Sequence, residues 1–258
     1  MDEVASYNRK RWRRLVEANA VYTRPALDLD PADARRWLDP DGRLGSVERK
    51  AVLVLAGGGG RQSVAFALLG ARVTVLDLSE EQLEQDRTVA AQRGLEIATV
   101  EGDMRDLSAF DAASFDIVWQ PYSLNFVPDS AAVFREVARV VRSGGTYCVQ
   151  IANPYFVGVG ERDFNGTGYV VTLPYVQGAL VEITDPAWVA RGRVTEPSRE
   201  YRQTMEAVIN GLVEGGFRIA HVDEGVDANP DPNATPGSWD HFNAIVPPWL
   251  SFWTVRDP

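Results

Sequence analysis

Apolar and polar stretches alternate with a regular rhythm through the middle of the chain. The apolar run at 52–55 shows no polar alternation, which is typical of a strand buried on both faces, and we predict further strands at 73–76, 96–100, 115–119 and 146–152. Helices are expected between them, at 61–69, 80–93 and 130–142. Strand and helix thus alternate for about a hundred residues, which predicts a parallel sheet covered on both faces.

The flanking segments do not follow this rhythm. Helices at 4–19 and 31–38 precede the first strand, and residues 1–50 are expected to form a helical cap across the mouth of the core. Residues 153–199, with strand-like pieces at 169–173 and 180–183, are interpreted as an inserted lid. The pattern of the remaining residues predicts a helix at 199–214, a strand at 217–223, a proline-containing loop at 225–238 and a last strand at 249–255. We therefore expect residues 51–258 to form one ligand-binding domain that carries the lid.

A glycine turn after the first strand is the strongest local signal. Four consecutive glycines occupy 57–60, and Asp77 ends the second strand 17 positions after Gly60. Glycines let a ligand approach the backbone, and an acid in this place can hold ribose hydroxyls. This context favours an adenosine-type ligand over the alternative, a purely structural turn.

Composition narrows the class of function. The chain has 258 residues and a net charge of −10, which argues against a nucleic-acid partner because binding to phosphates needs a basic face. Cys148 is the single cysteine and the two histidines are far apart, so we expect no internal disulfide and no clustered metal site. No apolar run is long enough to span a membrane, and the N-terminus lacks a signal peptide pattern, so we expect a cytoplasmic protein without a membrane partner.

Several motifs together resemble the class I S-adenosylmethionine-dependent methyltransferases. They are the glycine turn, Asp77, Gly102-Asp103-Met104 after the third strand, and the segment 139–145 before the fifth. The resemblance covers about 50–152, and 199–255 matches the family's final strand, helix and strand. It implies an α/β fold: a Rossmann-like, doubly wound, seven-stranded and mostly parallel sheet whose last strand is antiparallel. Within the family, the chain is most similar to the small-molecule enzymes of ubiquinone and menaquinone biosynthesis.

The resemblance also implies a cofactor site for S-adenosylmethionine, with S-adenosylhomocysteine as the product. The residues it implies are Ala56, Gly57, Gly58, Gly60, Gln62, Asp77, Leu78, Asp103, Met104, Gln120 and Tyr122. Asp77 would hold the ribose hydroxyls and Asp103 the adenine amino group. At the following helix N-terminus, Gln62, Ser63 or Arg61 could serve the methionine carboxylate. The family commonly has an acid two residues before its first motif glycine. Val54 and Ala56 stand at those positions here, which leaves open how the methionine amine is held.

Methyl transfer from a sulfonium is an in-line displacement, and a base is needed only when the acceptor must lose a proton. His241 is the first candidate for this base and Tyr122 the second, although His241 could be a structural histidine and Tyr122 could simply pack. Asn125, Asn153 and Tyr175 are candidates for lining the pocket of a small-molecule acceptor.

Two other functions remain open at this point. One is a nicotinamide-dependent oxidoreductase. Two observations argue against it: Ser63 occupies the place of the third glycine in the dinucleotide motif, and no Tyr-x-x-x-Lys occurs in the chain. The other is a non-catalytic protein that binds S-adenosylmethionine, which the altered first motif allows.

Overall fold

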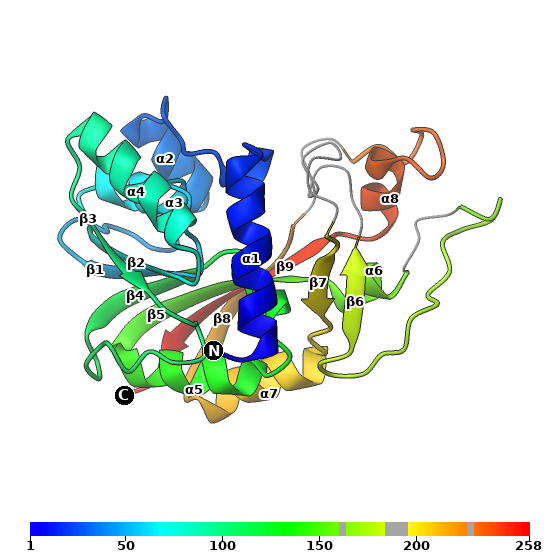
Figure 1. The fold of residues 1–258 in the computed structure, drawn as a ribbon. Coiled ribbons are helices and arrows are strands. Elements are labelled where there is room, and N and C mark those ends of the chain that lie inside the picture. Colours follow the sequence, from blue (N-terminus) through cyan, green and yellow to red (C-terminus); the bar gives the residue numbers. More distant parts are fainter. Residues whose placement is uncertain (160–163, 184–195, 226–229) are drawn as a thin grey trace.

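A seven-stranded sheet forms the centre of the molecule (Figure 1). The computed structural model describes residues 1–159, 164–183, 196–225 and 230–258. The strands are β1 (Ala51–Leu55), β2 (Arg72–Asp77), β3 (Ile97–Glu101), β4 (Phe115–Gln120), β5 (Val141–Ala152), β8 (Phe217–Gly225) and β9 (Trp249–Arg256), in the spatial order β3-β2-β1-β4-β5-β9-β8. Within this sheet β9 runs antiparallel to both of its neighbours, β5 and β8, and the other pairs are parallel. The predicted mostly parallel sheet with an antiparallel last strand is confirmed.

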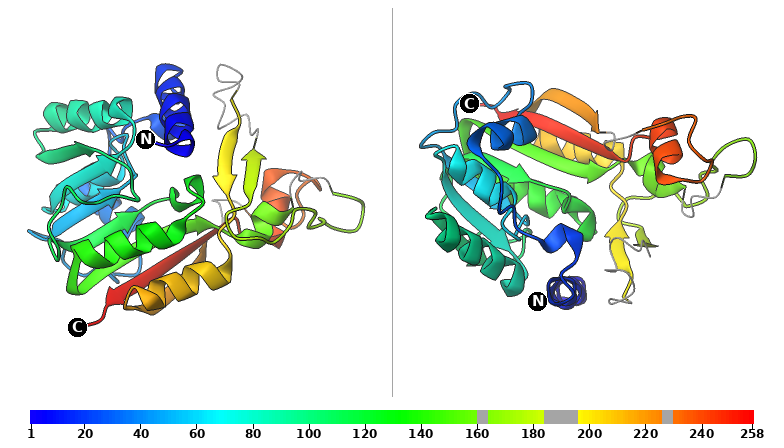
Figure 2. Two further views of the ribbon diagram at one scale, coloured as in Figure 1. Left: turned by 60° about the horizontal axis from the view of Figure 1, so that its bottom comes forward. Right: turned by 90° about the horizontal axis from the view of Figure 1, so that it is seen from above.

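Helices cover both faces of the sheet, as the alternation predicts. The helices α2 (Pro31–Leu38), α3 (Gln62–Leu68) and α4 (Glu80–Arg93) lie on one side, and α5 (Ser130–Val140) and α7 (Met205–Glu214) lie on the other (Figures 1 and 2). The alternation along β5 separates the two cores, because Cys148 packs with Trp253 on the first side and Tyr147 packs with Phe217 on the second. Within the described residues, no helix is both long and apolar enough to cross a bilayer.

The first helix, α1 (Glu3–Glu17), lies over the carboxyl ends of the strands. Arg9 forms an ion pair of 2.7 Å with Glu101 at the end of β3. The Asn8 side chain donates to the carbonyl of Phe126, in the short helix η2 (Leu124–Phe126) that follows β4, at 2.9 Å. These contacts place α1 across the edge of the sheet where parallel α/β proteins bind their ligands. A second short helix, η1 (Val21–Thr23), follows α1.

The segment beyond β5 differs most from the prediction. A two-stranded hairpin, β6 (Leu180–Ile183) with β7 (Ser198–Tyr201), stands beside α1 in all views (Figures 1 and 2). The predicted helix at 199–214 is wrong at its start, because 198–201 pair with β6 and α7 begins only at Met205, where Thr204 Oγ1 accepts from the N–H of Ala207 at 3.2 Å. The strand at 180–183 is confirmed.

Three further local predictions need correction. Residues 169–173 are not a strand, because the N–H groups of Thr172 and Leu173 both donate to the carbonyl of Gly158 and none joins a ladder. Two helices were missed, α6 (Pro154–Gly158) and α8 (Trp239–Ile245), which are capped by the side chains of Asn153 and Ser238. Most of the predicted lid, 153–199, is described, but residues 160–163 and 184–195 lie outside the described part, so its movement stays a prediction.

Candidate active site at the carboxyl edge of the sheet

The glycine turn is held by carboxylates from the neighbouring strand and helix. The N–H of Gly58 donates to Oδ2 of Asp77 at 2.9 Å. The N–H groups of Gly59 and Gly60 donate to the two oxygens of Asp86, on α4, at 2.8 and 3.0 Å. Ala56, which precedes the glycines, adopts a positive φ of 48°. The turn is therefore fixed before any ligand binds.

Asp86 is a site residue that the sequence analysis missed. Its side chain is fully buried and also accepts from the hydroxyl of Ser63 at the start of α3. Burial raises the pKa of Asp86 to about 6, against the opposing effect of the Ser63 hydrogen bond. In sequence it resembles an ordinary acid on a charged helix. The one available signal was its place three residues after Leu83 and three before Val89, on the apolar face of the same helix.

Asp77 has the geometry expected of a ribose ligand. Oδ1 accepts from the N–H of Ser79 at 2.9 Å and Oδ2 accepts from Gly58, so each oxygen keeps a lone pair for a hydroxyl. The residue is 9% exposed at the carboxyl end of β2, and burial raises its pKa. Gly58 has no room for a side chain, since an added Cβ would lie 3.0 Å from Oδ2 of Asp77. These features fit an adenosine whose ribose lies over Asp77.

The expected adenine side has a different character. Asp103 accepts from Arg105 through both oxygens, with Nη2 to Oδ2 at 2.6 Å and Nε to Oδ1 at 3.0 Å. Arg105 also pairs with Asp2, the N-cap residue of α1, at 2.7 Å. An adenine amino group would share Oδ2 with Arg105. Met104 is 9% exposed and Leu78 is half-buried, so both can offer apolar contact.

Gln120 and Gln62 border one cavity of about 200 Å³ on the α3 side of the sheet. Trp37, Trp119, Pro121 and Trp253 also line it. The Gln120 side chain is itself fixed, because its oxygen accepts from the Tyr147 hydroxyl at 2.5 Å and its nitrogen donates to Ser123 at 3.2 Å. Gln62, in the first turn of α3, keeps its place at a helix N-terminus.

Tyr122 meets a partner that the sequence did not suggest. Its hydroxyl donates to Oε2 of Glu200 on β7, and Glu200 is only 1% exposed. Burial raises the pKa of Glu200 to about 7, although the hydrogen bonds from Tyr122 and Ser198 and the positive charge of Arg11 lower it. Burial, the charge of Glu200 and the hydrogen bond to it raise the pKa of Tyr122 well above its ordinary value. A buried carboxyl with a pKa near neutrality is suited to proton transfer.

His241 lies in a separate cluster of aromatic side chains. Its Nδ1 is 2.8 Å from the hydroxyl of Tyr169, and the ring of Phe164 stands edge-on at 5.4 Å. The helix that carries it, α8, lies on the far side of the β6–β7 hairpin from α1 (Figures 1 and 2). The structure therefore brings Tyr122 together with Glu200, and places His241 among rings of the lid region.

The three candidate acceptor residues make mainly structural contacts. Asn125 accepts from the N–H of Ala152 at 2.8 Å, and Asn153 caps α6 by accepting from the N–H of Tyr155 at 3.0 Å. Tyr175 is 45% exposed and accepts from the N–H of Met205 at 3.0 Å. Asn153 follows the carboxyl end of β5 directly, and Asn125, in η2, contacts the last residue of that strand.

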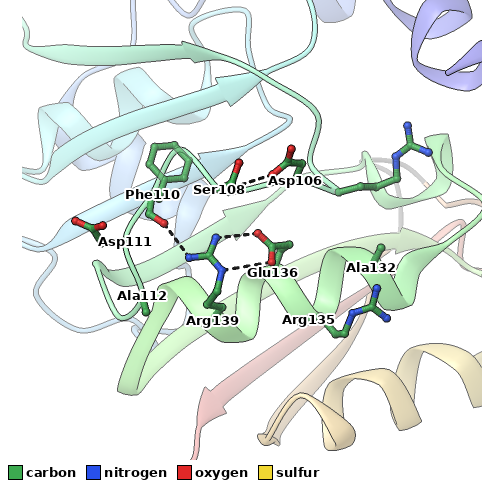
Figure 3. A pocket seen from close by; sticks show the side chains of 10 residues that line it. Asp106, Ser108, Phe110, Asp111, Ala112, Ala132, Arg135, Glu136 and Arg139 are labelled. Atoms are coloured by element: carbon green, nitrogen blue, oxygen red, sulfur yellow. Dashed lines mark hydrogen bonds and ion pairs between the residues drawn. The ribbon is translucent and has the colours of Figure 1, made fainter. Parts of the chain in front are cut away.

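A larger hollow of about 510 Å³ lies on the other side of the sheet, between α5 and the segment 105–112 (Figure 3). Its polar groups bind one another: Arg139 pairs with Glu136 at 2.8 Å and donates to the carbonyls of Leu107 and Phe110. Because these groups are already satisfied and the hollow is away from the glycine turn, we do not assign the active site to it.

A glycine turn and a terminal acid on adjacent parallel strands, with buried titratable groups at the same sheet edge, define a Rossmann-like enzyme that binds an adenosine-containing cofactor. A family model for the methyltransferase domain matches residues 53–149. The uncharacterized methyltransferase YbaJ of Bacillus subtilis (strain 168) is 32% identical over 236 residues, covering 85% of this chain and 89% of the relative.

Two other matches agree. A ubiquinone biosynthesis O-methyltransferase of Idiomarina loihiensis is 30% identical over 227 residues, covering 76% of this chain and 86% of the relative. The crystal structure of a putative S-adenosylmethionine-dependent methyltransferase from Listeria monocytogenes superposes with a TM-score of 0.66 at 20% identity, covering 87% of this chain and 99% of that chain. The chain belongs to the S-adenosylmethionine-dependent methyltransferases, and its cofactor is S-adenosylmethionine.

Proposed function

We propose that the enzyme methylates a small molecule by in-line displacement, in the space between α1, η2 and the β6–β7 hairpin. The observation that supports this most directly is the Tyr122–Glu200 pair at the carboxyl end of β4, beside the strands that carry the glycine turn and Asp77. The similarity to a ubiquinone biosynthesis O-methyltransferase agrees with a small-molecule acceptor.

When bound, the cofactor supplies a methyl group already activated on a sulfonium, so the protein mainly aligns the acceptor and keeps water out. Asp77 would hold the ribose, and Gln62 would serve the carboxylate of the methionine moiety. The contact between α1 and the hairpin, where the Tyr7 hydroxyl donates to the carbonyl of Pro197 at 2.9 Å, would limit the access of water. Glu200 would accept the proton of an acceptor hydroxyl, with Tyr122 holding its carboxylate in place.

Transfer of a labelled methyl group tests this proposal. The enzyme is incubated with S-adenosylmethionine carrying a tritiated methyl group and with a cell extract separated into low-molecular-weight and macromolecular fractions. We expect label in the low-molecular-weight fraction, and none with the Asp77→Ala variant. Label confined to protein or nucleic acid would refute a small-molecule acceptor.

The same assay compares the candidate bases. Glu200→Gln should slow transfer strongly, while His241→Asn should affect it only if His241 reaches the acceptor. A loss of activity in His241→Asn with normal turnover in Glu200→Gln would assign the base to His241.

A further inference from the structure

Arg202 carries a buried positive charge that no acidic side chain balances among the residues that the structure describes. It follows β7 directly and is 1% exposed. Within the part of the chain that the structure describes, none of its three guanidinium nitrogens has a hydrogen-bond partner. The guanidinium lies 5.6 Å from the centre of the Tyr175 ring. An uncompensated buried charge is strongly unfavourable, so the ligand-free protein retains this arginine at a cost to its own stability.

The position of Arg202 relates it to the proposed acceptor site. The N–H of Arg202 donates to the carbonyl of Ala179 at 2.9 Å, which continues the hairpin ladder by one residue. Side chains two residues apart on a strand share a face, so Arg202 follows Ser198 and Glu200 on the buried face of the hairpin, about 7 Å beyond Glu200. Glu200 in turn contacts Tyr122.

The two terminal nitrogens of Arg202 face a glycine. A Cβ added to Gly158, in α6, would lie 3.2 Å from both Nη1 and Nη2. A guanidinium binds a carboxylate through two parallel hydrogen bonds along one of its edges. A side chain at 158 would crowd the edge formed by Nη1 and Nη2, whereas glycine brings only backbone against it. The edge that carries Nε, which also has no described hydrogen-bond partner, is the one left for a carboxylate.

We propose that Arg202 binds a carboxylate group of the methyl acceptor, so that the acceptor is a small organic acid. The proposal rests on the proposed methyl transfer, because it takes the acceptor to lie beside Glu200. Among the described residues, the guanidinium of Arg202 has the Tyr175 ring beside it and no hydrogen-bond acceptor. A ligand there meets a single positive charge, which favours a carboxylate over a phosphate monoester.

Thermal unfolding of the full chain without cofactor tests this inference. The probes are benzoate, its neutral isostere benzamide and inorganic phosphate, at equal ionic strength set with chloride. The variants are Arg202→Met and, as a control, Arg135→Met, which removes an exposed arginine that has no ion pair within the described residues (Figure 3). We expect benzoate, but not benzamide, to raise the Tm of the wild type and of the control by about 2 °C or more.

The Arg202→Met variant should start from a higher Tm than the wild type, since it removes an unpaired buried charge, and benzoate should not shift it. An equal response of the wild type to benzoate and benzamide, or of the wild type and Arg202→Met to benzoate, would overturn the proposal. A larger response to phosphate than to benzoate would overturn the assignment to a carboxylate.

If Arg202→Met does not fold, Gly158→Ala is the deciding variant, because it keeps the positive charge while its Cβ crowds the guanidinium of Arg202. The Tm of this variant should not respond to benzoate, and a full response would overturn the proposal. This experiment measures no turnover, so a negative result would overturn carboxylate binding by Arg202 but not the proposed methyl transfer. A negative labelling assay would overturn the proposed methyl transfer but not anion binding by Arg202.

Discussion

Replacing Asp77 by alanine is the sharpest test of the cofactor site. The substitution removes the acceptor for the ribose hydroxyls and also the hydrogen bonds to Gly58 and Ser79, each 2.9 Å long. Hydrogen bonds to a charged group contribute about 1.5–3 kcal/mol. We therefore expect the affinity for S-adenosylhomocysteine to fall roughly 10- to 150-fold. The loss of the two protein hydrogen bonds is offset in part by the removal of a buried carboxylate, so the free energy of unfolding should fall by about 1–3 kcal/mol.

Isothermal titration calorimetry with S-adenosylhomocysteine measures the affinity, at a temperature where circular dichroism shows the variant to be folded. The matched control is Asp111→Ala, an exposed acid on the loop before β4. It should bind like the wild type. A folded Asp77→Ala variant with wild-type affinity would show that Asp77 does not contact the ribose. NADH should give no binding heat with any of these proteins.

Three further outcomes follow from the same contacts. Gly60→Ala should destabilise the fold by about 1–3 kcal/mol more than Gly94→Ala in urea unfolding. Both glycines have a positive φ (70° and 64°), but only a Cβ at position 60 would meet a neighbour, Val89, at 2.6 Å. Equal effects of the two substitutions would contradict this reasoning. Glu200→Gln should lower the transfer rate about 10²–10⁴-fold and remove its rise with pH through about 7, with S-adenosylhomocysteine affinity unchanged; an unaltered pH profile would exclude Glu200 as the base. Folding raises the pKa of Asp86 from 3.8 to about 6, so the folded state binds this proton more tightly and the free energy of unfolding should fall by up to about 3 kcal/mol as pH rises from 4 to 6. Asp86→Asn should lose this pH dependence of stability. A wild type whose stability does not fall over this range would refute the raised pKa of Asp86.

The sheet and the cofactor half of the site were predictable because their signals are local. The boundaries of α4 were predicted correctly from Ser79 at its N-terminus and Gly94 at its C-terminus, which adopts a left-handed φ of 64°. Asp77 could be placed because the end of a buried strand fixes where its last side chain lies. Neither inference needs any knowledge of which distant segments meet.

The acceptor half could not be predicted in this way. Tyr201 continues the apolar spacing of the following helix, and only pairing with β6, about 20 positions earlier, turns 198–201 into a strand. That pairing directs Glu200 and Arg202 inward, which no helical reading of the segment suggests. His241 attracted attention as an imidazole beside a polar loop, but the missed helix α8 packs it against Tyr169 and Phe164.

The charges buried on this hairpin have a consequence for the chemistry of the acceptor. Glu200 interacts with the positive charge of Arg11, a residue of α1 that is 2% exposed, so this acid has a cationic neighbour before any ligand binds. Arg202 on the same face has no described acceptor. A neutral acceptor would leave that charge uncompensated in a site from which water has been excluded, where the electrostatic cost is greatest. An anionic acceptor would neutralise it on entry, so binding and closure of the site would favour each other.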